Sequence, residues 1–387
     1  MKNLFFAFLS LFLIFSLNNI SAQSKKGKKK NKEINESVKK ENKKETIQPY
    51  GKVIKKSAIS DEGLFIVHKV EDNQYYEIPD SLFGREMLMV TRISKTASGI
   101  GFGGGKQNTQ VLRWERKNKK VLLRVVSHQI VASDSLPIHE AVVNSNFEPI
   151  LYSFDIKAIG KDSNSTVIQV NKFFEEDVKA IGYPLKRRKA YKISGIDKTR
   201  CYIESIKSYP LNIESRHVKT YKASDPPSNS STGSISMELN NSMVLLPVKP
   251  MRRRYFDQRV GWFSRSQTDY GLENQKSKSV RYLDRWKLEV KKEDIEKFKK
   301  GELVEPKKQI VYYIDRATPK KWIPYLKQGI EDWQIAFEEA GFKNAIIAKD
   351  PPSIEEDPDW SPEDVRYSVV RYLASPIPNA NGPHVSD

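Results

Sequence analysis

Short segments in which apolar and polar residues alternate recur through the middle of this 387-residue chain, and they constrain its fold more than any other feature. Alternation with a period of two is typical of strands that bury one face. Turn-rich stretches, such as the one at 225–230, separate the segments. Short strands at even spacing indicate a large antiparallel β domain, barrel-like or sandwich-like. The expected strands are residues 148–156, 165–171, 200–208, 212–221, 234–240 and 243–247.

Residues 49–97 form a shorter block of the same character. Strands are expected at 63–68, 75–78 and 86–93, with a hairpin turn at Asp72-Asn73. Residues 79–84 read as a turn or a single helical turn. The sequence therefore predicts a small β module at 49–97, followed by a large β-rich domain at 98–300.

The glycine-rich stretch at 99–106 formally matches the dinucleotide-binding pattern G-x-G-x-x-G. That motif needs a strand before it and a helix after it. Two alternating segments follow instead, at 109–115 and 121–126, and they predict a β-hairpin. No Ser or Thr follows Lys106, as a phosphate-binding P-loop would require. We therefore interpret the stretch as a flexible loop and assign it no cofactor-binding residue.

The period changes after about residue 300. Residues 309–314 are an apolar and aromatic run, which is typical of a buried strand. A single helix is expected over about 318–340, ended by Gly341, with further strands at 344–348 and 365–373. Strand, helix and strand in this order predict a right-handed βαβ unit. The apolar face of the helix is expected to consist of Trp322, Leu326, Ile330, Trp333 and Phe337.

Residues 1–22 have the pattern of a secretory signal peptide, with Lys2, an apolar run at 4–17 and a small-residue cleavage site ending at Ala22. The apolar run is shorter than the ~20 residues that a spanning helix needs. No cysteine lies directly after it at the cleavage site, which excludes a lipoprotein anchor. We expect an exported protein, periplasmic, on the outer surface or secreted, without a transmembrane span.

The net charge of +18 is unevenly distributed. Residues 24–46 contain ten lysines against four glutamates and almost no apolar residue, which predicts a disordered linker at 23–48. Such a tract can contact polyanions of the cell envelope. The cluster Lys186–Lys189 reads as a solvated strand end or loop.

Residues 252–270 alternate arginines with aromatic residues. One interpretation is nucleic-acid binding through stacking and charge. The other is a strap of arginines packed on aromatic faces between two domains. The signal peptide favours the second, so nucleic acid is not an expected partner. Cys201 is the only cysteine and lies in an alternating segment, so we expect a buried small apolar residue and not a nucleophile.

Several segments together resemble the start of a bacterial zinc-dependent metalloprotease of the met-zincin type. In the family, two uncharacterised modules precede the catalytic domain, and residues 78–82 and 254–263 resemble these modules. The resemblance implies a zinc cofactor, a protein or peptide substrate and a catalytic domain at 301–387 that is incomplete, because the zinc helix would follow residue 387. The segments that resemble the catalytic domain are Val-Tyr-Tyr-Ile-Asp at 311–315 and residues 322–329, 331–334, 336–346 and 364–372.

The residues that perform zinc hydrolysis are not found in the sequence. It contains no His-Glu-x-x-His, whereas zinc hydrolysis requires three protein ligands, a bound water and a glutamate base. Asp315, Glu331 and Asp332 read as surface or cap charges. We assign no catalytic, cofactor-binding or metal-ligating residue and expect no zinc bound to this chain. The histidines, of which no two have the spacing of helical metal ligands, are His68, His128, His139, His217 and His384.

Taken together, these patterns predict an α+β protein, in which mostly antiparallel β modules precede an incomplete α/β metzincin-like domain at 301–387. The expected function is that of the N-terminal portion of an exported zinc-dependent metallopeptidase, inactive as this chain. The alternative is a non-catalytic, envelope-associated β-rich binding module. A third interpretation, a binder of nucleic acid or other polyanions, rests on charge alone.

Overall fold

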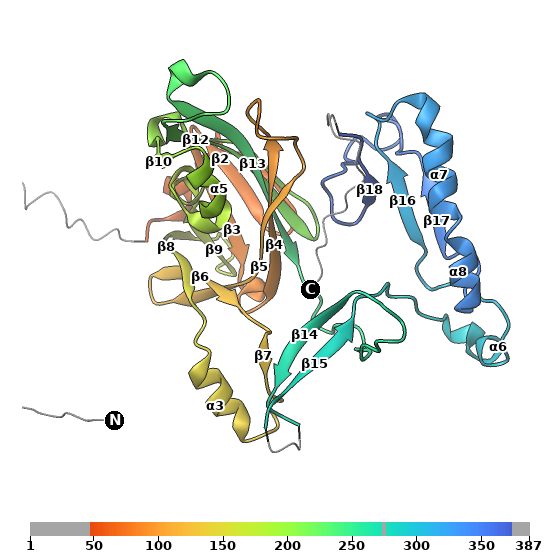
Figure 1. The fold of residues 1–387 in the computed structure, drawn as a ribbon. Helices are drawn as coiled ribbons and strands as arrows, with labels where there is room; N and C mark the ends of the chain where they lie inside the picture. The colour runs from red at the N-terminus through yellow and green to blue at the C-terminus, as the bar shows by residue number, and fades with distance from the viewer. Residues whose placement is uncertain (1–46, 273–275, 374–387) are drawn as a thin grey trace, which may run out of the picture. The chain divides into compact units, whose positions relative to one another are not determined.

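The computed structural model describes residues 47–272 and 276–373 (Figure 1). The expected signal peptide at 1–22, most of the expected linker at 23–48 and His384 lie outside the described residues. Within the described part of the chain, no helix is long and apolar enough to cross a membrane.

Most of the β structure is one antiparallel sheet of 12 strands. Their spatial order is β1-β2-β3-β9-β8-β6-β5-β4-β13-β12-β10, and β11 also pairs with β12. The mostly antiparallel β character expected from the sequence is thereby confirmed. The strands are β1 (Ile59–Asp61), β2 (Ile66–Val70), β3 (Asn73–Pro79), β4 (Glu86–Lys95), β5 (Lys106–Lys117), β6 (Lys120–Val126), β8 (Ile150–Ile159), β9 (Ser165–Gln169), β10 (Ile193–Ile196), β11 (Tyr202–Ser208), β12 (Asn212–Ala223) and β13 (Ser234–Leu245).

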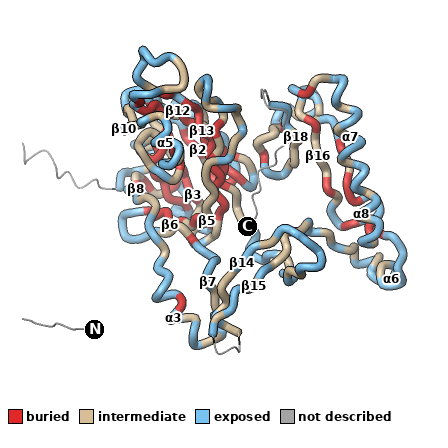
Figure 2. The backbone as a smooth tube through the Cα atoms, in the orientation of Figure 1, coloured by how far each residue is buried: buried red, intermediate tan, exposed pale blue. Residues whose placement is uncertain are grey.

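The two expected β modules share this sheet. Strand β3 of the first module pairs with β9, and β4 pairs with both β5 and β13. Their side chains also form one core, in which the ring of Phe65 lies 6.0 Å from that of Trp114, and Trp114 lies 5.6 Å from Phe154. Figure 2 shows the buried residues concentrated in these strands.

Strand β13 corrects one prediction. Residues 234–240 and 243–247 were expected to be separate strands, but β13 runs through both and pairs with β12 without a break in register. The polar residues at 240–242 do not form a turn, because they have partners inside the sheet. Asn241 donates a 2.7 Å hydrogen bond from Nδ2 to Oγ1 of Thr91.

The glycine-rich stretch at 99–106 is the connection between β4 and β5, and β5 and β6 form the expected hairpin. Gly99, Gly101 and Gly104 have positive φ angles of 82°, 117° and 89°. A Cβ at Gly103 would lie 2.6 Å from the carbonyl oxygen of Ser94. The glycines are therefore explained by the backbone path of this loop.

Short helices accompany the sheet: α2 (Tyr50–Val53), α4 (Asn171–Glu175) and α5 (Leu185–Ala190). Helix α5 corrects the prediction of a solvated loop at 186–189. Arg188 is buried within it and makes two 2.8 Å hydrogen bonds to the carboxylate of Asp177. Its guanidinium also lies 4.7 Å from the ring centre of Tyr221. Burial with a partner of opposite charge accounts for a charged residue that the local sequence places at the surface.

A separate sheet of three strands has the order β15-β14-β7 and consists of β7 (Ile130–Val131), β14 (Ser264–Asp269) and β15 (Lys278–Leu283). Helix α3 (Ile138–Ser145) follows β7. The arginines of this region stack on its own aromatic rings. Arg281 lies 3.6 Å from the ring centre of Phe256, and Arg253 lies 4.9 Å from that of Tyr282.

The C-terminal part of the described chain contains a parallel sheet in the order β17-β16-β18. Its strands are β16 (Ile310–Ile314), β17 (Ile346–Lys349) and β18 (Ser368–Val370). The chain passes from β16 to β17 through the 3-10 turn η7 (Lys320–Trp322), helix α7 (Ile323–Glu331) and helix α8 (Gln334–Glu339), while α6 (Ile295–Lys299) precedes β16. The order strand, helix, strand, strand agrees with the sequence prediction.

The single helix expected over 318–340 is divided in two. Pro324 occupies the first turn of α7, so the helix begins after Trp322. At the junction with α8, the amide of Trp333 donates a hydrogen bond to the carbonyl of Ile330, three residues back, which is a tighter turn than that of an α-helix. Trp322 and Trp333 are 46% and 64% exposed, contrary to their expected place on the buried face.

Candidate functional site

The described histidines do not form a zinc site. Among residues 47–272 and 276–373, no group of three or more His, Cys, Asp or Glu side chains could hold a metal ion. Within the described part of the chain, the side chains do not supply the three-ligand set that a zinc hydrolase needs. The partners of the histidines are Ser60 and Glu77 for His68, Glu86 for His128 and the carbonyl of Ala132 for His139, while His217 is fully buried.

The carboxylates of Asp315 and Glu331 accept hydrogen bonds from other residues of the C-terminal region. Asp315 accepts a 3.3 Å hydrogen bond from Arg371 and a 3.2 Å bond from the amide of Ala317. Glu331 accepts a 3.2 Å bond from the amide of Ala348, which ties α7 to β17. Asp332 is exposed.

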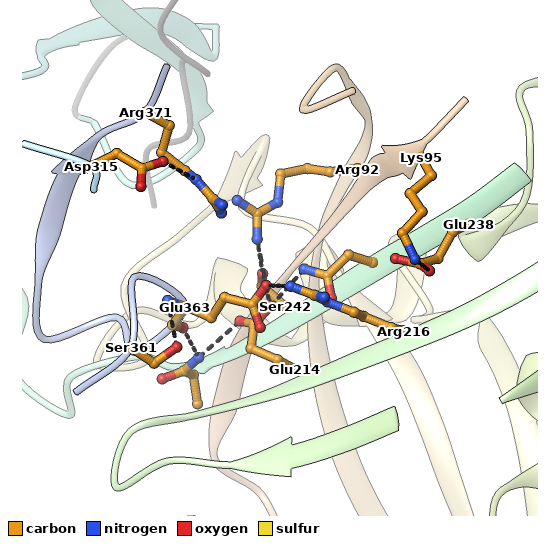
Figure 3. A network of polar contacts seen from close by, with 12 residues as sticks. Arg92, Lys95, Glu214, Arg216, Glu238, Ser242, Asp315, Ser361, Glu363 and Arg371 are labelled. Carbon is orange, nitrogen blue, oxygen red and sulfur yellow. Dashed lines mark hydrogen bonds and ion pairs between the residues drawn. The ribbon is translucent and has the colours of Figure 1, made fainter. Parts of the chain in front are cut away.

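Figure 3 shows a polar network that includes Glu214, a buried carboxylate on β12. Glu214 is 3% exposed. Its Oε1 accepts a 2.8 Å bond from Asn212, and its Oε2 accepts bonds of 2.7 Å from Asn240 and 2.8 Å from Ser242. Burial raises the pKa of Glu214, although the nearby Arg92 guanidinium and these three donors act in the opposite direction.

The strand register brings this network together. Alternate residues of a strand share one face, so Asn212, Glu214 and Arg216 all point to the same side of β12. Glu214 is opposite Ser242 on β13, and Arg216 is opposite Asn240, which in turn is opposite Arg92 on β4. The sequence alone did not reveal the site, because polar residues at alternate positions normally indicate a solvent-facing side.

The network also holds a distant segment of the chain. Arg216 forms an ion pair with Glu363. Asn212 donates a 2.9 Å bond to the carbonyl of Glu363 and accepts a 3.0 Å bond from the amide of Val365. We call these four residues, Asn212, Arg216, Glu363 and Val365, the clasp.

The clasp is suited to recognising a peptide segment. The Asn212 side chain forms hydrogen bonds with the backbone on both sides of Asp364. Arg216 forms an ion pair with the acidic side chain of Glu363 (Figure 3). Asp364 is itself 1% exposed at its side chain and forms an ion pair with Arg366. The chemistry available at the clasp is therefore hydrogen bonding and charge pairing.

The opposite face of β12 carries a second set of buried polar groups. Lys219 is fully buried and donates bonds of 2.8 Å and 2.5 Å to the carbonyls of Phe174 and Glu176, where α4 ends. Burial lowers the pKa of Lys219 to about 8. Burial and the Lys219 charge lower the pKa of His217 to about 3. Cys201 is buried, as expected from its alternating segment.

Comparison with known proteins gives two family matches without a stated function. Residues 47–96 match a family described as domain of unknown function DUF5118, and residues 104–291 match domain of unknown function DUF5117. No curated protein and no solved structure matches the chain. The two matched ranges fall close to the β modules expected at 49–97 and 98–300, and both end before β16.

Proposed function

We propose that the chain is the N-terminal portion of an exported zinc-dependent metallopeptidase. In this proposal, the 12-stranded sheet is a non-catalytic scaffold, and residues 301–387 begin the catalytic α/β domain. The observation that carries the proposal is the order strand, helix, strand, strand over residues 310–370, with β16 parallel to both of its neighbours. This is the order that the resemblance of residues 311–346 and 364–372 implies.

The clasp gives the scaffold a role within this proposal. It holds Glu363 and Val365, and β18 begins at Ser368, soon after them. Strand β18 pairs with β16 through Tyr312 to Ile314. Fixing the segment before β18 therefore positions the edge of the parallel sheet. The scaffold thus orders a part of the proposed catalytic domain without contributing to its chemistry.

Zinc content and peptidase activity test the proposal. Residues 23–387 should bind no stoichiometric zinc and should not hydrolyse peptides in a chelator-sensitive manner. A reading frame extended past the Asp387 codon should supply His-Glu-x-x-His. Its product should bind stoichiometric zinc and hydrolyse peptides in a chelator-sensitive manner. Chelator-sensitive hydrolysis by residues 23–387 would contradict the expectation that this chain is inactive. An extended product that binds no zinc would overturn the proposal that the chain belongs to a zinc-dependent metallopeptidase.

The β14–β15 region favours the alternative, a non-catalytic envelope-associated binding module. Its exposed aromatic residues include Tyr255 and Phe263, which are 71% and 75% exposed, beside stacked arginines. Under this alternative, residues 23–387 should sediment with purified cell envelopes without zinc, and Tyr255→Ala should weaken that association. Unchanged sedimentation of Tyr255→Ala would remove the support that this surface gives to the alternative.

A further inference from the structure

The first three strands of the large sheet carry a line of hydrogen-bonded polar groups. Ser60 on β1 lies directly opposite His68 on β2, with Oγ 2.7 Å from Nδ1 of the imidazole. The Nε2 of His68 lies 2.9 Å from Oε2 of Glu77 on β3. A hydroxyl, an imidazole and a carboxylate are thus joined in series, which is the arrangement that activates a serine for nucleophilic attack.

The carboxylate at the end of this series is held in place by two further donors. Tyr50 donates a 2.8 Å bond to Oε2 of Glu77, and Ser165 donates a 2.6 Å bond to Oε1. Burial by itself would raise the pKa of Glu77, but the bonds from His68, Ser165 and Tyr50 outweigh it and lower the pKa to about 2. Glu77 is therefore ionised at neutral pH.

An ionised Glu77 selects the tautomer of His68. A carboxylate without a proton can only accept, so the proton of a neutral imidazole lies on Nε2. Nδ1 then carries a lone pair and accepts from the hydroxyl of Ser60. This is the state in which a histidine can act as the general base for a serine.

The nucleophile of a serine hydrolase must be accessible to its substrate, and the exposure of the three residues meets this requirement. Ser60 is exposed, whereas His68 and Glu77 are 3% and 6% exposed, and all three line a cavity of about 1050 Å³. This volume is at the upper end of the roughly 300–1,000 Å³ typical of small-molecule sites. The hydroxyl can meet a ligand, while the base and the carboxylate are shielded from water.

Gly160 leaves room for this arrangement. A Cβ at this position would lie 1.8 Å from Oγ of Ser165 and 2.6 Å from Oε1 of Glu77. Any larger residue would displace the bond between Ser165 and Glu77. Segments far apart in the sequence, around Tyr50, Glu77 and Ser165, thus converge on one carboxylate.

We propose that Ser60 is a nucleophile activated by His68, with Glu77 as the positioning residue, in an ester-cleaving site independent of the proposed zinc chemistry. As the Oγ–C bond forms, the hydroxyl proton passes to Nδ1 of His68, and Glu77 stabilises the imidazolium. The ester C–O bond then breaks, and the alcohol leaves with the proton from Nδ1. Water hydrolyses the acyl-serine by the same steps, which releases a carboxylic acid and restores Ser60.

A fluorophosphonate probe tests the nucleophile on purified residues 23–387. Attack by Ser60 forms an Oγ–P bond and expels fluoride, and peptide mass spectrometry locates the adduct. Wild type and the control Ser135→Ala, which alters an exposed serine outside this cavity, should be labelled at Ser60. Ser60→Ala should lose that adduct, and His68→Asn should slow labelling by about tenfold or more. No adduct at Ser60, or labelling that His68→Asn leaves unchanged, would overturn the proposal.

Two variants separate positioning from mere structural support. Ser165→Ala removes one hydrogen bond to Glu77 but keeps the Glu77 charge, so labelling should slow less than in Glu77→Gln. Glu77→Gln removes the charge and should slow labelling by about tenfold or more. Thermal melts of each variant measure the fraction that is unfolded. If labelling of Glu77→Gln falls only in proportion to that fraction, the proposed positioning role of Glu77 is overturned. EDTA should leave labelling unchanged, so failure of the zinc proposal would not affect this result.

Discussion

Lys219 is a buried residue whose protonation makes the stability of the sheet depend on pH. Its ammonium is fully buried and donates hydrogen bonds to the carbonyls of Phe174 and Glu176. Two neutral acceptors replace water incompletely, which is why burial lowers the pKa of Lys219 to about 8. The folded protein therefore releases this proton at a lower pH than the unfolded chain does.

We expect the stability conferred by Lys219 to rise with pH. Between about pH 8 and pH 10 the unfolded chain binds more protons at this residue, so wild type should gain up to about 2–3 kcal/mol relative to Lys219→Met. Denaturant unfolding at several pH values measures the difference. Lys207→Met, which alters an exposed lysine on the neighbouring strand β11, is the control and should show no such trend. A wild-type advantage over Lys219→Met that is constant from pH 7 to pH 10 would contradict this account.

The burial of a single residue could be predicted from the sequence where it depends only on the alternation of apolar and polar neighbours. The burial of Cys201 followed from the alternation of apolar and polar residues in its own segment. The burial of Glu214 and Arg188 did not, because each depends on partners on other elements, such as Asn240 and Asp177. Likewise, the contacts among Ser60, His68 and Glu77 depend on the register of three strands, which the sequence pattern does not specify.

At the scale of elements, two glycines within the proposed catalytic domain should respond to alanine in opposite ways. Gly329 lies within α7 with no atom within 4 Å of an added Cβ, so Gly329→Ala should stabilise the helix by about 0.5–1 kcal/mol. Gly341 follows α8 with a φ of 92°, and an added Cβ would lie 2.5 Å from Phe298.

Gly341→Ala should therefore destabilise the segment by about 1–3 kcal/mol. Hydrogen exchange of α7 and α8 reports the local effect of both variants, and thermal melts report the global one. Slower exchange in Gly329→Ala and faster exchange in Gly341→Ala are the expected results. Effects of the same sign would mean that these helices end differently from the structure described.

The bounds of helices and strands differed from the sequence prediction where they depend on turn geometry or on contacts with other segments. The apolar spacing from Trp322 to Phe337 predicted one helix, but it could not show the tight turn at Trp333. The break expected between 240 and 243 was wrong because Asn241 finds a partner, Thr91, on β4. Period and turn propensity describe local preferences, and pairing across the sheet can override them.

For the whole molecule, the shared sheet predicts that the two matched families fold as one unit. Phe65, Tyr76 and Ile78 from the first module lie in the same core cluster as Trp114. Residues 98–387 alone should therefore lose much of the core and leave β9 without its partner β3. We expect no cooperative thermal transition from residues 98–387, measured by circular dichroism. A transition within a few degrees of that of residues 23–387 would show that the modules are independent.

The central claim is that the sheet holds the segment before β18 through the clasp, and hydrogen exchange of residues 361–367 tests it most directly. Arg216→Gln, Glu363→Gln and the double variant should each accelerate exchange there by about tenfold, equivalent to about 1.4 kcal/mol, with the double variant less than additive. Lys95→Gln, which breaks the Lys95–Glu238 pair on the same sheet, is the control and should change nothing in this segment. Equal exchange of residues 361–367 in wild type and all clasp variants would contradict the scaffold role.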